Sequence, residues 1–415
     1  MTKNVFQTST TCRLCGSERV ESVLELSPTP PGDLFLTKDR LENSTPLYPL
    51  TLALCLDCGY VHLPYLLDPV ISYSNYVYET KVTVGLSNHY QEYATNVASL
   101  AGASPSALAI DLGSNDGTML KAFRDLGLRV LGIEPNERIA EVANKDGLNT
   151  ISGYFSESIA TQIVQEYGKA LIVTANYMYA NIADVEEFTN HVKTILDPQG
   201  IFVVQTGYHP QQMKLNMFDY IYHEHYSYFT VKVLKKHFER CNLELVDVSL
   251  HKAKGGSIRA VVQHKGGRRK PQKSVGLFIK SEDQIGVHKP TAYMKFSEKL
   301  DGLKIELTAL LKKIKGMNKS IVGYGASHST TTLLYHFDIG HYIDYIVDDN
   351  SIKHGLFSPG YHLPVYPASK LNSAKPEYAL ILGWQHRESI INRNREFLSN
   401  GGRFIVPLPK LVVVE

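Results

Sequence analysis

The chain has 415 residues, of which 43% are hydrophobic and 20% are charged, and its formal net charge is +2. At about 100–200 residues per domain, this length predicts two to four domains. The two signs of charge are interspersed, which gives no electrostatic footprint for nucleic acid, and no run of 18 apolar residues indicates a membrane span. The N-terminus lacks a signal-peptide pattern, so we expect a cytoplasmic protein with no membrane partner.

Residues 1–75 carry two C-x2-C pairs, and each pair is followed by a glycine. The four cysteines are Cys12, Cys15, Cys55 and Cys58. Two such pairs can surround one ion with four thiolates, which predicts a structural Zn²⁺ site without an open position for catalysis. The alternatives are two disulfides or four unligated thiols, and a reduced cytoplasm favours the metal. A module this small would depend on the metal for its stability.

The rest of the chain alternates short apolar runs with helical periodicity, in two successive units. In residues 76–300 we predict parallel strands at 106–111, 129–134, 171–175 and 200–206, each followed by a helix. A helical stretch follows around residues 290–315. A second α/β unit, in residues 301–415, has predicted strands beginning at 319, 342 and 378. The fold class is therefore α/β, with a small zinc-binding module and two Rossmann-like domains.

The first strand of the central unit runs into a glycine-rich turn and then a helix. The turn comprises Asp111-Leu-Gly113-Ser-Asn115-Asp116-Gly117, and Glu134 ends the next predicted strand. Glycines let a ligand approach the backbone, and an acid at a strand end can bind ribose hydroxyls. The turn lacks the G-x-G-x-x-G pattern of pyrophosphate binding, which favours S-adenosylmethionine over a dinucleotide. An ordinary strand–turn–helix with a surface glutamate is the alternative.

A second cluster combines histidine, glutamate and tyrosine between Phe218 and Tyr228. The motif His223-Glu224-His225 is not H-E-x-x-H, so a zinc-protease site is not expected. On a strand or loop, the two histidines could share one face with Glu224 opposite. A histidine titrates near neutral pH and can accept a proton from carbon. A buried polar cluster that fixes a loop explains the pattern equally well.

Taken together, these motifs resemble the three-domain sugar C-methyltransferases, which methylate C-3 of nucleotide-linked 4-keto-deoxysugars. The resemblance extends over the whole chain and rests on motif order and spacing. The matching pieces are the two cysteine pairs, the Gly113–Gly117 turn, Glu134-Pro135, His223-Glu224-His225, Lys254-Gly-Gly-Ser-Ile-Arg259, Gly323-Tyr-Gly-Ala326, Asp348-Asp-Asn350 and Pro359-Gly360. It implies that the zinc module helps cover the substrate, that the middle domain binds S-adenosylmethionine, and that the C-terminal domain closes over the nucleotide sugar.

The resemblance also implies roles for individual residues. His225 is the expected base that removes the C-3 proton, Tyr222 and Glu224 are expected to hold the sugar or tune that base, and Tyr76 is expected to face the same cleft. The predicted methyl-donor site comprises Asp111, Gly113, Asn115, Asp116, Glu134, Phe155 and Asn176. The partner is a nucleoside-diphosphate sugar, and the enzyme is expected to be a monomer or small homo-oligomer.

Two stretches depart from the pattern of that family. Asn181 occupies the place of a usual histidine, with Tyr177 at the place of an asparagine. Gln205 stands near the place of a frequent acid. These amides form hydrogen bonds but do not exchange protons at neutral pH. The fold and the methyl donor do not depend on these positions, whereas the acceptor and the methylated position do.

Other functions fit parts of the sequence. An O- or N-methyltransferase on a related sugar needs His225 only to deprotonate a hydroxyl or an amine. The Gly323-Tyr-Gly325 turn suggests a nicotinamide-dependent oxidoreductase, although it also fits a plain tight turn or a contact with the substrate's diphosphate. A regulatory zinc protein fits the cysteines alone. His328 and His386 receive no role from sequence.

Overall fold

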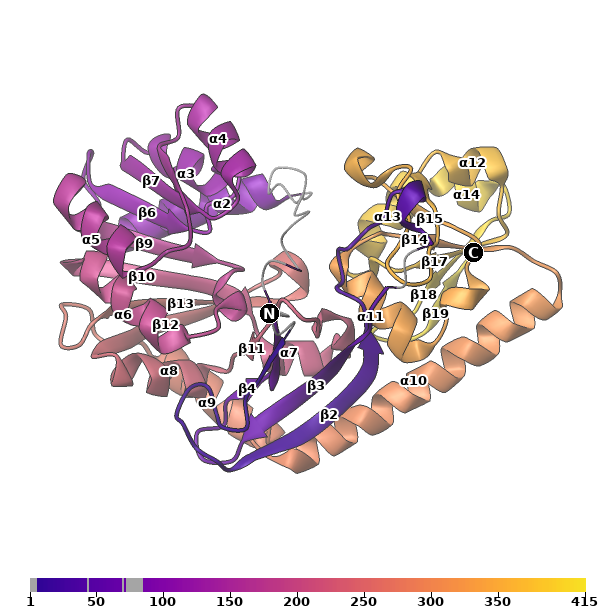
Figure 1. Ribbon diagram of the computed structural model, residues 1–415, viewed down its shortest axis with the longest axis horizontal. Helices are drawn as coiled ribbons and strands as arrows, with labels where there is room; N and C mark the ends of the chain where they lie inside the picture. Colours follow the sequence, from indigo (N-terminus) through magenta and orange to yellow (C-terminus); the bar gives the residue numbers. More distant parts are fainter. Residues whose placement is uncertain (1–5, 43–44, 69–70, 72–84) are drawn as a thin grey trace.

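The computed structural model describes residues 6–42, 45–68, 71 and 85–415. Figure 1 shows two α/β lobes, one from the middle of the chain and one from its C-terminal part, with the N-terminal strands running beneath both. Tyr76, an expected substrate-site residue, lies outside the described residues. The predicted domain boundaries after residues 75 and 300 stay predictions.

The middle lobe is built on a seven-stranded sheet of order β12-β13-β10-β9-β6-β7-β8. Its strands are β6 (Leu108–Leu112), β7 (Arg129–Glu134), β8 (Thr150–Ser152), β9 (Ala170–Asn176), β10 (Leu196–Gly207), β12 (Leu243–His251) and β13 (Ser257–His264). The four predicted strands are confirmed as β6, β7, β9 and β10, which lie parallel. The sequence did not predict β12 and β13, which add antiparallel to the β10 edge.

Helices cover both faces of this sheet, which explains why its strands read as continuous apolar runs. They are α2 (Leu86–Ala101), α3 (Thr118–Arg124), α4 (Glu137–Lys145), α5 (Glu157–Glu166), α6 (Val185–Ile195), α7 (His209–Lys214), α8 (Val231–Arg240) and α9 (Lys273–Ile285). Tyr93 of α2 and Phe123 of α3 pack with Val203 on one face. Phe188 of α6 and Phe238 of α8 pack in the core on the other face.

The chain order in this sheet reverses between β6 and β9. From β6 the chain proceeds outward through β7 to β8, and it then returns to β9 on the other side of β6. The loops that follow β6 and β9 therefore diverge and leave a crevice at the carboxyl ends of the strands. Open α/β sheets bind their ligands at such a point.

The N-terminal strands form a four-stranded sheet of order β11-β4-β3-β2 and a pair β1-β5. Their bounds are β1 (Phe6–Thr8), β2 (Val20–Thr29), β3 (Tyr48–Cys55), β4 (Val61–His62), β5 (Tyr65–Leu67) and β11 (Ser227–Tyr228). Strand β11 belongs to the middle part of the chain and begins two residues after His225. Leu24 and Leu52 lie in one core with the C-terminal lobe, whereas Cys12 and Cys55 lie in the core of the middle lobe. The small N-terminal module thus packs on both lobes.

The C-terminal lobe has a six-stranded sheet of order β16-β15-β14-β17-β18-β19. Its elements are β14 (Ile321–Tyr324), α11 (His328–Phe337), β15 (Ile346–Asp348), β16 (Val365–Pro367), α12 (Lys370–Ala374), β17 (Tyr378–Ile381), α13 (Arg387–Arg393), α14 (Arg395–Ser399), β18 (Arg403–Val406) and β19 (Val412–Val414). The predicted helix at 290–315 is confirmed as α10 (Pro290–Gly316), which connects the lobes in Figure 1. The predicted strand at 342 begins only at Ile346, because the chain first makes a 3-10 turn over Gly340–Tyr342.

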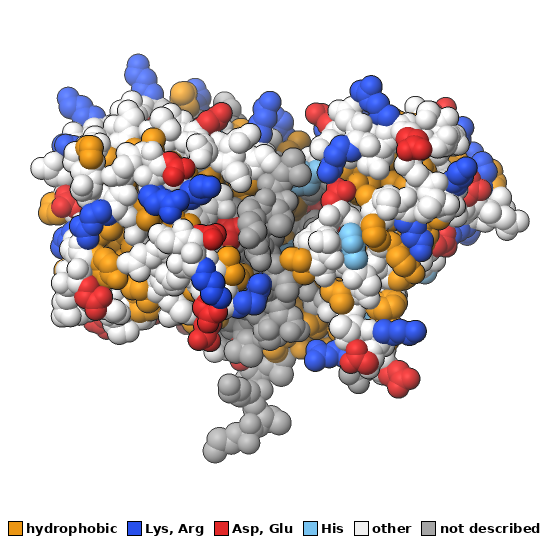
Figure 2. Space-filling model, turned by 90° about the horizontal axis from the view of Figure 1, so that it is seen from above, with side chains coloured by type: hydrophobic (Ala, Val, Ile, Leu, Met, Phe, Trp, Pro, Cys, Tyr) orange, Lys and Arg blue, Asp and Glu red, His pale blue; other side chains and the backbone are white. Residues whose placement is uncertain are grey.

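Charged side chains are distributed without a one-sign patch on the face seen in Figure 2, where lysine and arginine alternate with acidic side chains over both lobes. In the described part of the chain, no helix combines the length and the apolar character needed to cross a bilayer. The long helix α10 carries lysine and glutamate along its length, in keeping with a solvated outer face.

Candidate functional site

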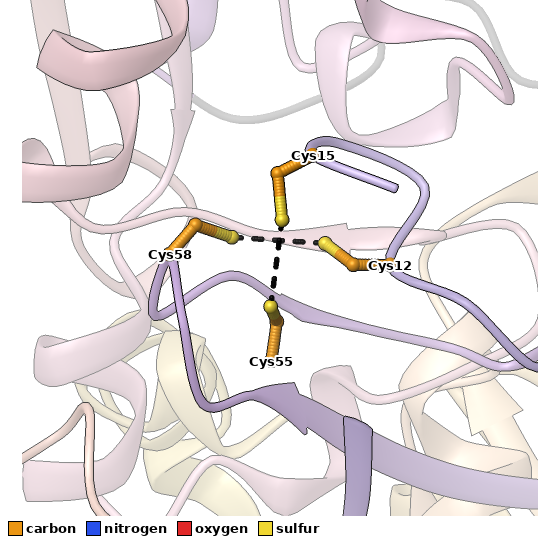
Figure 3. Close-up of side chains that lie close together, drawn as sticks. All are labelled: Cys12, Cys15, Cys55 and Cys58. Atoms are coloured by element: carbon orange, nitrogen blue, oxygen red, sulfur yellow. Dashed lines mark hydrogen bonds between the residues drawn. The ribbon is translucent and has the colours of Figure 1, made fainter. Parts of the chain in front are cut away.

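The four predicted zinc ligands lie together (Figure 3). Their sulfur atoms are all within 4.8 Å of one another, and the Sγ atoms of Cys12 and Cys58, and of Cys15 and Cys55, are 3.6 Å apart. A disulfide needs about 2.05 Å, so these are not disulfides. Four sulfurs at about 2.3 Å from one Zn²⁺ in a tetrahedron lie about 3.8 Å apart, which is close to the observed spacing. The four cysteines therefore fit a structural Zn²⁺.

The metal-binding turns also position part of the neighbouring lobe. Gly16 and Gly59 follow the two pairs with φ of 74° and 81°, values that suit glycine. Arg13, inside the first pair, donates through Nη2 to the carbonyl of Tyr226 at 2.5 Å and through Nη1 to that of Ala183 at 2.8 Å. The zinc module is thereby joined to the residue that follows His225.

A cavity opens at the crevice between β6 and β9. It is lined by most of the predicted donor-site residues, namely Asp111, Gly113, Asn115, Glu134, Phe155 and Asn176. Asp116 is not among the lining residues. Its Oδ1 accepts from the Thr118 backbone N–H at 3.1 Å and from the Thr118 hydroxyl at 2.5 Å, which stabilises the start of α3.

Two buried carboxylates, Asp111 and Glu134, line this donor cavity. Glu134 accepts the N–H of Asn115 at 2.9 Å and that of Asn136 at 2.9 Å, one on each oxygen. Asp111 accepts from Thr174 Oγ1 at 2.5 Å and from Asn176 Nδ2 at 3.1 Å. Burial raises the pKa of Asp111 to about 7, although the two hydrogen bonds act to lower it. The Glu134 oxygens keep further lone pairs that can accept ribose hydroxyls, so the cavity fits the adenosine part of S-adenosylmethionine.

A second cavity, the acceptor cavity, is lined by Tyr222, Glu224 and His225. The imidazole of His225 approaches the Tyr220 carbonyl at 3.1 Å through Nδ1 and the Tyr222 hydroxyl at 2.8 Å through Nε2. A carbonyl only accepts, so Nδ1 carries the proton and Nε2 accepts from the phenol. Burial is the main cause that lowers the pKa of His225 to about 3. The ring is therefore neutral, with its basic nitrogen toward Tyr222.

The expectation that His223 and His225 share one face, with Glu224 opposite, is wrong. Glu224 and His225 line the acceptor cavity, whereas His223 is buried elsewhere, with Nε2 at 3.2 Å from the carbonyl of Pro49. Residues 223–224 form a turn, so the two-residue alternation of a strand does not apply.

The donor and acceptor cavities adjoin. Three residues line both: Tyr177, Asn181 and Lys254. Gln205 lines neither cavity and lies behind Tyr177, to whose hydroxyl its Nε2 donates at 2.6 Å. The sequence motifs gave no role to Lys254. The two glycines that follow it are the signal of a turn with an unusual backbone, and they are the feature that could have directed attention to it.

His328 also lines the acceptor cavity, although the sequence left it without a role. It begins α11 of the C-terminal lobe, and its ring centroid is 5.4 Å from that of Tyr222. Its Nδ1 lies 3.8 Å from Oδ1 of Asp33, a residue of the N-terminal module. The acceptor cavity is thus lined by residues of the middle and C-terminal parts of the chain, and the N-terminal module contacts one of them through Asp33.

The glycine turn of the C-terminal lobe binds a carboxylate through backbone N–H groups, as the turn of the middle lobe binds that of Glu134. Asp348 accepts the N–H of Ala326 at 2.6 Å and that of Asn350 at 2.7 Å. Lys353 Nζ donates to the Ala326 carbonyl at 2.6 Å and to Asp33 at 2.5 Å. A buried lysine thus lies against this turn, and the Asp348 carboxylate serves the backbone.

Comparison with known proteins gives matches along the whole chain. The family models that match are described as "C-methyltransferase C-terminal domain" over residues 252–409, "Methyltransferase domain" over residues 87–248 and "Putative zinc binding domain" over residues 12–73. The C-methyltransferase NovU of Streptomyces niveus is 30% identical over 405 residues, which cover 97% of this chain and 96% of that protein.

Solved structures of methyltransferases match less than half of the chain, at low identity. The CcbJ methyltransferase from Streptomyces caelestis is 17% identical with a TM-score of 0.34, covering 43% of this chain and 90% of that one. Magnesium protoporphyrin IX methyltransferase from Synechocystis PCC 6803, solved with S-adenosylhomocysteine, is 12% identical with a TM-score of 0.34, covering 46% of this chain and 90% of that one. The identity that extends over nearly the whole chain, together with the three domain matches, shows that this protein belongs to the zinc-containing, S-adenosylmethionine-dependent C-methyltransferases.

Proposed function

We propose that this enzyme methylates C-3 of a nucleotide-linked 4-keto-deoxysugar, with His225 as the base that forms an enolate. The observation that carries the proposal is the neutral His225, oriented by the Tyr220 carbonyl in a cavity that adjoins the donor cavity. A base in a cavity that adjoins the donor cavity is suited to an acceptor that must be activated beside its methyl donor.

The proposed proton transfer uses the Nε2 lone pair of His225. This nitrogen accepts from the Tyr222 hydroxyl, so the phenol must turn toward the substrate when the sugar binds. Tyr222 can then donate to a sugar oxygen, while Nδ1 stays fixed on the Tyr220 carbonyl. Glu224 lies on the same wall and is proposed to hold a sugar hydroxyl.

The donor site and the acceptor site have separate residues. The Gly113–Asn115 turn, Glu134, Phe155 and Asn176 are proposed to hold S-adenosylmethionine, which supplies an electrophilic methyl group when bound. His328, at the start of the ten-residue helix α11, is proposed to face the diphosphate end of the sugar nucleotide. The N-terminus of a helix carries unpaired N–H groups that favour an anion.

The proposal is tested by isotope exchange without the methyl donor. In heavy water, the wild-type enzyme should introduce deuterium at the carbon next to the ketone of a thymidine-diphosphate-linked 4-keto-6-deoxyhexose. His225→Asn should lose exchange and methyl transfer by about 10²–10⁴-fold, the usual contribution of a general base, and should bind S-adenosylhomocysteine normally.

The methylated product locates the new carbon bond. C-3 and C-5 both flank a C-4 ketone, and carbon NMR separates them. Methylation at C-5 would contradict the proposed position while retaining the base mechanism. A methyl group on oxygen or nitrogen, or full exchange in His225→Asn, would contradict the enolate mechanism itself.

A further inference from the structure

Lys254 lies at the place where the donor and acceptor cavities meet, and it lines both. It belongs to the turn that joins the antiparallel strands β12 and β13, after His251 and before Ser257. This hairpin is at the same edge of the sheet as the end of β10. Strand pairing therefore places a lysine of this turn at the cavity wall.

The backbone of the turn is held in a conformation that lysine rarely adopts. Lys254 has φ of 50° and ψ of 42°, and Gly255 and Gly256 follow with φ of 81° and 121°. A Cβ on Gly255 would lie 2.5 Å from Met217 Cε, and one on Gly256 would lie 2.8 Å from Gln211 Cγ. Glycine is thus favoured at both positions, chiefly because other residues rarely adopt these φ values. Strained residues of this kind persist where the surrounding structure fixes them, often at active sites.

Tyr177 also lines both cavities and is likewise in a left-handed conformation, with φ of 59°. The Lys254 ammonium lies 4.4 Å from the centroid of the Tyr177 ring, within the range of a cation–π contact. The Tyr177 hydroxyl accepts from Gln205 Nε2 at 2.6 Å and lies 3.3 Å from Ser257 Oγ.

Gln205 is itself fixed from behind. It is fully buried, and its Oε1 accepts from Arg259 Nε at 3.0 Å. Its Nε2 lies 2.7 Å from Nε2 of His89, and burial lowers the pKa of His89, so the neutral ring accepts there. The Arg259 guanidinium lies 3.7 Å from the centroid of the Tyr93 ring. This buried network orients Tyr177, and Tyr177 places its ring against Lys254.

We propose that Lys254 is a further catalytic residue, whose ammonium donates to the ketone oxygen and stabilises its negative charge in the enolate, and that Tyr177 is the positioning residue for it. The inference rests on the proposed function, because it assigns the group that the enolate oxygen requires. A weakly basic His225 removes a carbon-bound proton efficiently only if the charge that develops on oxygen is stabilised.

Enolate formation and methyl transfer proceed by three changes of bonding. His225 Nε2 forms a bond to the α-proton, the C–H pair becomes the C=C bond, and the C=O π pair moves to the oxygen that Lys254 stabilises. The enolate carbon then forms the C–CH₃ bond and the carbonyl is restored, while the sulfur of the donor keeps the pair of the broken S–CH₃ bond. The imidazolium finally releases its proton to solvent.

The charges in the cavity agree with this role. After burial, the positive charge of Lys254 also lowers the pKa of His225. This cation therefore acts on the space that the substrate enters. A positive field of this kind stabilises an anionic intermediate more than the neutral ketone, which is the requirement for accelerating its formation.

The test compares Lys254→Met with Lys252→Met, a change at the exposed lysine two residues earlier in the same hairpin connection. With the thymidine-diphosphate 4-keto-6-deoxyhexose probe, Lys254→Met should lose about 10²–10³-fold in deuterium exchange and in methyl transfer, as expected for one oxyanion donor. Its affinity for S-adenosylhomocysteine should stay unchanged. Lys252→Met should exchange at the wild-type rate.

Three further variants complete the test. Lys254→Asn should fold well, because asparagine tolerates the left-handed region, and it should show the same loss of exchange. Tyr177→Phe keeps the ring but loses its hydrogen bond to Gln205, so it should lower kcat with little change in KM. Lys254→Arg should retain part of the deuterium exchange that Lys254→Met loses.

The possible failures are distinguishable. Absence of exchange in the wild-type enzyme would overturn the proposed function, and this inference with it. Wild-type exchange that survives in Lys254→Met would overturn only the role of Lys254. Weaker S-adenosylhomocysteine binding with unchanged exchange would show that Lys254 instead holds the donor's carboxylate, which also contradicts the proposal.

Discussion

Replacing Glu134 by alanine should weaken binding of the methyl donor and destabilise the turn beneath it. The carboxylate accepts the N–H groups of Asn115 and Asn136 at 2.9 Å, so Glu134→Ala removes the acceptor of two backbone donors. Each buried donor that loses its partner costs about 1–3 kcal/mol, which gives a loss of about 2–6 kcal/mol in the free energy of unfolding. The loss of a charged acceptor for the ribose hydroxyls should weaken binding by about 1.5–3 kcal/mol, or roughly 10- to 150-fold.

Glu134→Gln separates these two effects. Glutamine keeps one acceptor oxygen but directs an NH₂ group at the other backbone N–H, so about half of the stability loss should remain. Binding of S-adenosylhomocysteine is measured by calorimetry, and stability without ligand is measured by urea unfolding. Glu141→Ala is the control, because Glu141 is exposed on α4 and its long ion pair with Lys145, at 3.8 Å, lies on the surface. If Glu134→Ala binds S-adenosylhomocysteine within twofold of wild type, the ribose is held elsewhere and the reasoning is refuted.

Two other changes test the metal site and the buried histidines. Cys55→Ser should lower the zinc content from about one ion per chain, as measured by elemental analysis, and make residues 12–58 sensitive to limited proteolysis. Full zinc occupancy in the variant, or no zinc in the reduced wild-type protein, would exclude a four-cysteine site. Burial lowers the pKa of His237 to about 3, so below about pH 6.5 the unfolded chain binds a proton that the folded chain does not, and stability falls as the pH falls. Between pH 7 and pH 5, the free energy of unfolding in urea should therefore fall by about 2 kcal/mol less in His237→Gln than in the wild type. An equal fall in both proteins would contradict the lowered pKa of His237.

The sequence alone was enough to predict the features that depend on neighbouring residues. The two C-x2-C pairs place their sulfurs through tight turns, so the ligand set of the zinc site follows from spacing within each pair. The strands β6, β7, β9 and β10 are buried on both faces, and their apolar runs therefore stand out from the helical patterns between them. Glu134 was predicted at the end of a strand because parallel strands bring their carboxyl ends to one edge of the sheet.

The tertiary structure decided the features that depend on residues far apart in the chain. Strand β11 pairs with β4, and this contact places the turn with Glu224 and His225 against the zinc module; no local pattern encodes that pairing. The same turn geometry directs His223 away from the cavity. Lys254 reaches the donor and acceptor cavities only because β12 and β13 add to the β10 edge, and His328 reaches the acceptor cavity only because the C-terminal lobe packs on the N-terminal strands. Spacing along the chain determines turns and pairs of metal ligands. The position of one cavity beside another is determined by long-range packing, because burial of apolar surface between segments far apart in the sequence supplies its free energy.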